Sequence, residues 1–158
     1  MSSSILNDLI ISLKLLEQNP ENPHYFEDFE SIVCQIGHLK DPDSISLLMQ
    51  FLTDESEELQ LMWAIIHTIE IFDDEIYIKE ILKISPYLDN HFSEWAYIIF
   101  VRILNSDKCR IEMIRQLRDS SSVVKTAIQN LMEKINRESS DFLTKTDAVL
   151  VAASIDNK

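Results

Sequence analysis

Glycine is almost missing from this chain, since Gly37 is the only glycine among 158 residues, and proline occurs just four times. Tight β-hairpin turns need residues with positive φ, and glycine adopts that conformation most readily. A chain with one glycine therefore has few ways to build hairpins. The composition favours an all-α fold.

Cysteine is also scarce, and Cys34 and Cys109 show neither the spacing of a metal site nor a disulfide framework. Both lie in apolar helical patterns, so we expect them to be small buried side chains. No apolar run approaches the ~18 uncharged residues of a membrane span. The N-terminal stretch lacks the basic region and the cleavage site of a signal peptide. We therefore expect a cytoplasmic protein without a membrane segment.

Positive charge is in short supply, and the shortage is confined to one part of the chain. Twenty-seven Asp and Glu face fourteen Lys and Arg, which gives a net charge of −13. Residues 1–72 hold thirteen acidic and two basic residues, whereas residues 107–158 hold eight and nine. Such a field repels nucleic acid and anionic lipid and attracts basic partners. A solvated acidic surface that only aids solubility is the simpler interpretation.

Apolar residues at helical spacing fill the segments between the prolines and predict eight helices. The expected ranges are 4–17, 25–38, a segment opened by Asp41 and Pro42, 56–72, 75–88, 93–104, 107–118 and 123–137. Gly37 is expected to mark the end of the second helix, and Ser56 to cap the fourth.

Three consecutive segments, 41–72, 73–105 and 106–138, each show a short helix followed by a longer one, with a period of about 32–34 residues. One helix pair cannot bury both of its apolar faces, so stacked pairs are needed to make a core. We predict a HEAT-like α-solenoid of about four antiparallel helix pairs, in a single domain over residues 1–138. An ordinary antiparallel helix bundle is the alternative. Residues 139–158 are expected to form a C-terminal capping helix or a partly ordered tail.

Acidic clusters at the two ends of the fourth predicted helix are the first candidate binding residues. They comprise Asp54, Glu55, Glu57, Glu58, Asp73, Asp74 and Glu75. Carboxylates at a helix start offset the positive end of the helix dipole, which accounts for part of the first cluster. Four carboxylates within five residues exceed that requirement, so we expect an electronegative docking surface.

A stripe of mixed residues is the second candidate site. Trp63, His67 and Glu70 stand at i, i+4 and i+7, and a shift of 32 residues places Trp95 and Arg102 on the equivalent stripe. Glu70 and Arg102 could form a buried ion pair, or the stripe could be a partly exposed groove with Trp and Arg anchors. A catalytic His67–Glu70 pair is the third interpretation. Because the chain offers no convincing nucleophile, phosphate loop or metal-ligand spacing, we predict no enzyme activity, cofactor or metal.

The sequence also resembles a bacterial family through two stretches, MWAIIHTIEIFDDEIYIKEIL and SEWAYIIFVRILNSDKCR, within residues 41–135. The likeness rests on the Trp-x-x-x-His-x-x-Glu spacing, the acidic turn after Phe72, and the Glu94-Trp95-Ala96 and Arg102-Ile103-Leu104-Asn105 elements. The chain is similar to immunity protein family thirty of polymorphic and contact-dependent growth inhibition toxin systems.

The resemblance implies a non-enzymatic inhibitor that binds and neutralises the C-terminal toxin domain of its own system in the cytoplasm. Many such toxins are nucleases with basic clefts, so the implied partner is a basic toxin domain. An acidic inhibitor would meet that partner quickly through electrostatic steering. A general HEAT-like scaffold with a different protein partner is the alternative. The toxin's identity, the mode of inhibition and the oligomeric state stay open.

Overall fold

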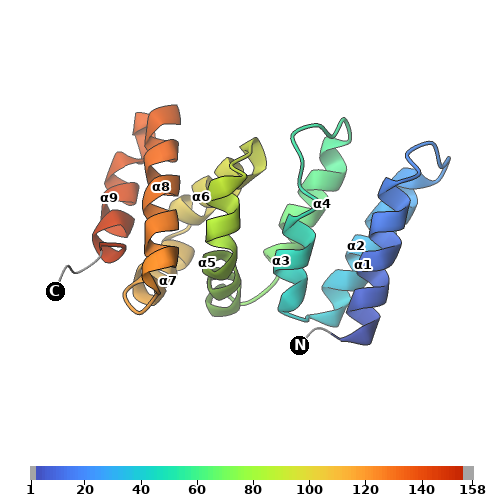
Figure 1. Cartoon of the computed structure of the whole chain (residues 1–158), viewed down its shortest axis with the longest axis horizontal. Helices are drawn as coiled ribbons and strands as arrows, with labels where there is room; N and C mark the ends of the chain where they lie inside the picture. The colour runs from blue at the N-terminus through green and yellow to red at the C-terminus, as the bar shows by residue number, and fades with distance from the viewer. Residues whose placement is uncertain (1–2, 155–158) are drawn as a thin grey trace. The chain divides into compact units, whose positions relative to one another are not determined.

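Helices account for all the regular structure in the computed structural model, which describes residues 3–154; these residues contain no β-strand (Figure 1). The all-α prediction is confirmed. The chain forms two compact units, residues 1–73 and 74–158, which we call the N-terminal unit and the C-terminal unit. The single repeat-like domain expected over residues 1–138 stays a prediction.

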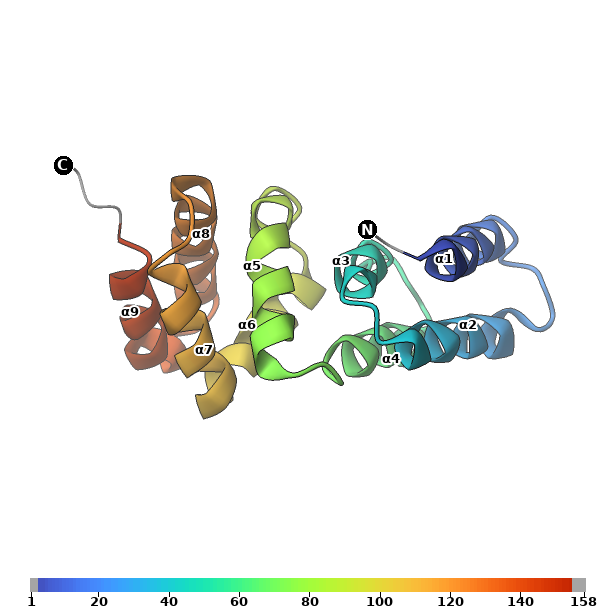
Figure 2. The same ribbon diagram turned by 90° about the horizontal axis from the view of Figure 1, so that it is seen from below.

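The N-terminal unit is built in two layers from α1 (Ser4–Glu17), α2 (Tyr25–Leu39), α3 (Asp43–Met49) and α4 (Leu59–Ile69). α1 packs against α2, α3 packs against α4, and α2 packs against α4. Figure 2 shows α1 and α3 in one layer and α2 and α4 in the other. The α1–α2 loop and the α3–α4 loop lie at the same end of this unit (Figure 1).

The sequence pattern predicted that Gly37 marks the end of α2. That prediction is wrong, because Gly37 lies inside the helix. The helix continues to Leu39, and Lys40 ends it with a left-handed backbone (φ 50°). A Cβ placed on Gly37 would come within 3.0 Å of Cγ2 of Thr68, a residue of α4. The missing side chain therefore lets α2 and α4 approach closely.

The fourth predicted helix is shorter than expected, and the prediction that Ser56 caps it is wrong. Residues 51–58 form a loop, and α4 begins only at Leu59. Within this loop, the backbone N–H of Glu58 donates to Ser56 Oγ at 3.2 Å, and that of Glu55 donates to Thr53 Oγ1 at 3.2 Å. These hydroxyls stabilise turns, a role that competes with helix formation.

The C-terminal unit contains α5 (Asp74–Asn90), α6 (Glu94–Asn105), α7 (Asp107–Leu117), α8 (Ser122–Glu138), the 3-10 helix η1 (Ser140–Phe142) and α9 (Leu143–Ala152). α5 packs against both α7 and α8, and α6 packs against α7. Side chains of Ser93, Ser106 and Ser121 accept hydrogen bonds from the first turns of α6, α7 and α8. Serine at this position satisfies a backbone donor that the helix itself cannot pair.

α5 runs through Pro86, where the sequence predicted a disturbance. Proline has no N–H, so the carbonyl of Leu82 loses its helical donor. The hydroxyl of Ser85 donates to that carbonyl at 2.7 Å, which replaces the missing bond inside the core. As a result α5, at 17 residues, is longer than α6, at 12, so the expected order of a short and then a longer helix is wrong for this pair.

The expected capping segment contains α9, which packs against α7 and α8. Gln129 Nε2 donates to the carbonyl of Ala153 at 2.8 Å, and the Thr146 hydroxyl donates to Asn136 Oδ1 at 2.8 Å. These bonds tie α9 to α8. Residues 155–158 of the expected tail lie outside the described residues.

Candidate functional site

The two compact units differ greatly in net charge. Residues 1–73 hold fourteen Asp and Glu against Lys14 and Lys40, a net charge of −12. Residues 74–158 hold thirteen Asp and Glu against twelve Lys and Arg, a net charge of −1. Nearly all of the negative charge of the chain therefore belongs to the N-terminal unit.

One end of the N-terminal unit gathers carboxylates from different elements. Glu17 ends α1, Glu58 immediately precedes α4, and Tyr25 begins α2. Burial raises the pKa of Tyr25 above its ordinary value, and the negative charges of Glu17 and Glu58 raise it further. Burial also raises the pKa of the Glu17 carboxyl. Carboxylates that lie 41 positions apart in the sequence thus act on the same phenol ring.

The first acidic cluster lies in the loop before α4, which we call the acidic loop (residues 53–58). Its four carboxylates are all exposed: Asp54, Glu55, Glu57 and Glu58. The cluster was expected to open the helix that Ser56 caps, but only Glu58 reaches the helix, as its N-cap. Helix-dipole compensation therefore explains little of this cluster, and the other carboxylates face solvent.

The second acidic cluster crosses the boundary between the units. Asp73 is exposed at the end of the N-terminal unit, while Asp74 and Glu75 lie in the first turn of α5. Cys109 Sγ donates to Asp74 Oδ1 at 3.4 Å, and Gln116 Nε2 donates to the Glu75 carbonyl at 3.0 Å. These two contacts hold the start of α5 against α7. Their role in partner binding stays a prediction.

The mixed stripe also has members in both units, with Trp63, His67 and Glu70 in the first and Trp95 and Arg102 in the second. Trp63 is half-buried on α4, and its ring lies 5.7 Å from that of the exposed His67. Glu70 is the C-cap of α4. In the C-terminal unit, Trp95 is buried in the first turn of α6, whereas Arg102 is exposed. Because Glu70 and Arg102 belong to different units, their ion pair stays a prediction.

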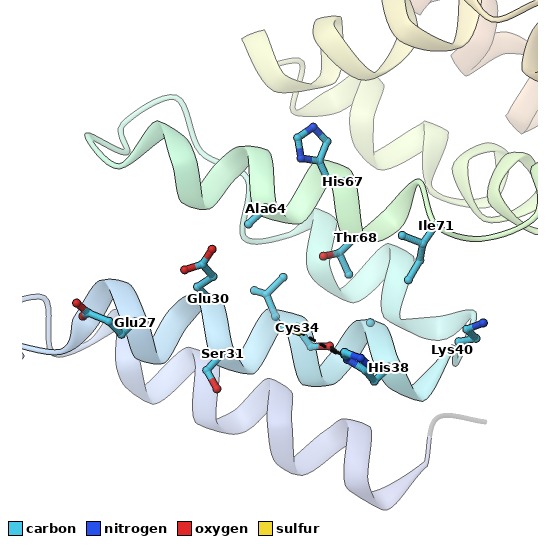
Figure 3. A pocket seen from close by; sticks show the side chains of 12 residues that line it. Glu27, Glu30, Ser31, Cys34, His38, Lys40, Ala64, His67, Thr68 and Ile71 are labelled. Atoms are coloured by element: carbon cyan, nitrogen blue, oxygen red, sulfur yellow. Dashed lines mark hydrogen bonds between the residues drawn. The ribbon is translucent and has the colours of Figure 1, made fainter.

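A groove between α2 and α4, which the sequence analysis did not predict, has a volume of about 780 Å³. We call it the α2–α4 groove. α2 contributes Glu27, Glu30, Ser31, Val33, Cys34 and His38 to its lining. The facing wall is formed by Ala64, His67 and Thr68 of α4, followed by Ile71 (Figure 3).

The groove has a direction, because α2 and α4 run the same way along its two sides (Figure 3). Glu27 and Glu30 lie toward the N-terminal end of α2, and Lys40 lies at the opposite end. Apolar surface between these ends comes from Ala64, the methyl of Thr68 and Ile71, which is 56% exposed, above the buried Val33.

Cys34 is exposed in this groove, which contradicts the prediction that both cysteines are buried. Cys109 is only half-buried. His38 Nδ1 donates to the Cys34 carbonyl at 2.8 Å and lies 3.6 Å from Cys34 Sγ (Figure 3). A glycine within a helical pattern indicates close packing, and Gly37 was the sequence signal for this groove.

Two further properties concern residues 3–154 only. No cluster of three or more His, Cys, Asp or Glu side chains in this range is placed to hold a metal ion. None of the helices in this range combines the length and the apolar character needed to cross a membrane.

The molecule is therefore an all-helical protein with a strongly acidic N-terminal unit and an open groove on that unit. The chain belongs to the family Immunity protein 30, which matches residues 13–113 and so includes the groove and both acidic clusters. No curated protein and no solved structure matches the chain. Family membership indicates an immunity protein of a toxin system, and such proteins are generally not enzymes.

Proposed function

We propose that this protein binds and neutralises the cognate C-terminal toxin domain of a contact-dependent or polymorphic toxin system in the cytoplasm. In this proposal, the N-terminal unit supplies the acidic surface and the toxin domain supplies a basic one. The observation that carries the proposal is the net charge of −12 on residues 1–73, set against −1 on the remainder.

Unbalanced charge of this size has a physical cost, because like charges repel within one compact unit. A basic partner removes that cost on binding. The same field accelerates encounter with the partner, by roughly 10- to 10³-fold at low salt. If the toxin is a nuclease, its basic cleft attracts an acidic inhibitor as it attracts nucleic acid, so the inhibitor and the substrate compete for the cleft.

The arrangement of the N-terminal unit supports a HEAT-like interpretation for that part of the chain. Its two helix pairs, α1 with α2 and α3 with α4, stack so that the second helices of the pairs lie side by side. Stacked pairs of this kind expose a long surface formed by equivalent helices. In the proposal, α2, α4 and the acidic loop together form the docking surface.

The experiment compares two quadruple charge reversals that change the net charge equally, from −13 to −5, since each reversal adds two charges. The first set, in the N-terminal unit, is Glu55→Lys, Glu57→Lys, Glu58→Lys and Asp73→Lys. The control set, in the C-terminal unit, is Asp119→Lys, Glu138→Lys, Asp141→Lys and Asp147→Lys. All eight residues are exposed.

Binding is measured by calorimetry against the cognate toxin domain, identified by its co-purification with this protein from the native host, and growth rescue is measured in cells that express that domain. We expect the first set to weaken binding on the order of 100-fold, about 2.7 kcal/mol, and to abolish rescue, while the control set changes affinity less than about threefold. Circular dichroism verifies that both variants are folded. Equal affinities for the two folded variants would contradict the proposal.

A further inference from the structure

We propose that the α2–α4 groove is the seat for one amphipathic helix of the toxin domain. The apolar side of that helix fills the groove, and its Lys or Arg side chains lie against Glu27 and Glu30. This inference rests on the proposed function and names the contact by which the acidic unit holds its partner.

The first argument is shape. The groove lies between two helices that run side by side in one direction, and its volume of about 780 Å³ is open along their length. This volume is within the range of ~300–1,000 Å³ that binding sites usually occupy. A helix laid into such a groove inserts side chains at i, i+3, i+4 and i+7, which is a recurrent way of recognising a partner helix.

The second argument is the exposed apolar surface. Ile71 is 56% exposed beside the groove, and the half-buried Ala64 and Thr68 methyl line it above the buried Val33. Gly37 lies at the base of the groove, where a Cβ would come within 3.0 Å of Thr68 Cγ2, so the glycine lets the two walls approach closely. Apolar surface gathered in a concave site on an otherwise highly charged unit is typical of a protein interaction site.

The third argument is charge complementarity. Exposed Glu27 and Glu30 lie toward one end of the groove, and the acidic loop, Glu17 and Tyr25 lie at the same end of the unit. Lys40 lies at the opposite end, beside the exposed His38. A helix with cations at one end of its apolar stripe therefore fits in one direction only, because the reversed helix would place its cations against Lys40.

Cys34 offers a direct way to identify what enters the groove. Replacing Cys109 by Ser, which keeps a donor for Asp74 Oδ1, leaves Cys34 as the single thiol of the chain. A benzophenone maleimide on Cys34 then cross-links to the cognate toxin domain under light, and mass spectrometry identifies the joined peptide. The control handle is Thr126→Cys, an exposed position on α8, in a Cys34→Ser, Cys109→Ser background.

We expect the Cys34 handle to join a helical peptide of the toxin domain that has an apolar stripe and clustered Lys or Arg, and the Thr126→Cys handle to join nothing at comparable yield. A cross-link to an acidic or extended segment would overturn the inference. So would the absence of a cross-link at Cys34 from a complex that has been shown to form.

A steric test uses a matched pair of alanines. Ala64→Trp fills the groove, whereas Ala148→Trp adds the same bulk to an exposed position on α9. We expect Ala64→Trp to weaken toxin binding at least tenfold and Ala148→Trp to leave it within twofold. Should Ala64→Trp fail to fold, the smaller Ala64→Leu, matched with Ala148→Leu, makes the same comparison with the same expected direction of the effect.

The outcomes separate this inference from the proposed function. If the wild-type protein does not bind the toxin domain, both are overturned. If charge reversal in the acidic loop weakens binding but the blocked groove binds as the wild type does, only the groove inference is overturned.

Discussion

Residues 1–73 carry two lysines for fourteen carboxylates, whereas residues 74–158 carry twelve Lys and Arg for thirteen. The two units thus have nearly the same number of acidic side chains and differ in their cations. The acidic character of the N-terminal unit comes from the basic residues it lacks.

The C-terminal unit uses its cations to hold its own helices. Lys134 Nζ lies 2.6 Å from Asp89 Oδ1, donates to the Asp89 carbonyl at 2.7 Å, and sits 5.3 Å from the centre of the Phe92 ring. Arg115 donates to Glu112 from two nitrogens, at 2.5 and 3.0 Å. Several charges in this unit are thus paired within it.

The N-terminal unit holds the opposite arrangement, with fourteen carboxylates and only two lysines to pair with them. Exposed pairs contribute only about 0–1 kcal/mol each, so stability alone does not explain why one unit has cations and the other does not. The proposed function accounts for the difference, because in that proposal the unbalanced charge serves binding and the balanced unit serves as support.

The largest expected effect tests whether the two compact units also unfold separately. Leu13 in α1 and Leu131 in α8 are both fully buried, so truncation to alanine leaves a cavity in each unit. Each variant should lose about 2–5 kcal/mol of stability. In hydrogen exchange on the full chain, Leu13→Ala should reduce protection in residues 3–73, and Leu131→Ala in residues 74–154. Equal loss of protection in both ranges for both variants would contradict the division into two units.

An intermediate effect is expected at the close approach beneath the groove, a feature of the N-terminal unit. Gly37→Ala gains roughly 1 kcal/mol of helix propensity but places a methyl 3.0 Å from Thr68 Cγ2. Thr68→Ser removes that Cγ2 atom. The alanine should therefore be more stabilising in the Thr68→Ser background, by about 0.5–1 kcal/mol in a denaturant double-mutant cycle. Thr126→Ser on α8 is the control background, and a coupling of equal size there would refute the contact.

The smallest expected effect is a pH response of opposite sign in the two units. Burial raises the pKa of Glu17 in the folded state, so its contribution favours folding at low pH and is lost as pH rises through the folded pKa. Hydrogen bonds from Arg115 and Gln116 lower the pKa of Glu112, so its contribution is present at neutral pH and is lost as pH falls through the folded pKa.

Glu17→Gln should accordingly raise the melting temperature of the full chain at pH 7, and Glu112→Gln should lower it. Both differences should shrink at about pH 3, where the glutamates become protonated. A melting-temperature shift of the same sign for the two variants at pH 7 would contradict the opposite pKa shifts of Glu17 and Glu112.

Much of the fold was accessible from the sequence because helices depend on local patterns. The bounds of α1 were predicted correctly from its apolar spacing and the proline-rich segment that follows it. α4 was predicted too long because Ser56 reads as a helix cap, while in the structure its hydroxyl stabilises a turn of the acidic loop. Local propensity does not decide between these two uses of one serine.

The site was less accessible, because it depends on which helices meet. The charge asymmetry was visible in the sequence, but the groove needs α2 and α4 side by side, and no local pattern states that pairing. Cys34 was expected to be buried because it follows Ile32 and Val33. It is exposed because it lies on the face of α2 that borders the open groove.

The most direct test of the central claim is the rate at which the toxin domain associates with this protein, measured by stopped flow at about 20 mM and about 500 mM salt. For the wild type and for the control set of charge reversals in the C-terminal unit, we expect the rate to fall by about 10- to 10³-fold with added salt. For the set in the N-terminal unit, we expect a slow rate that barely changes with salt. A salt-independent wild-type rate, or equal slowing by the two sets, would contradict the account.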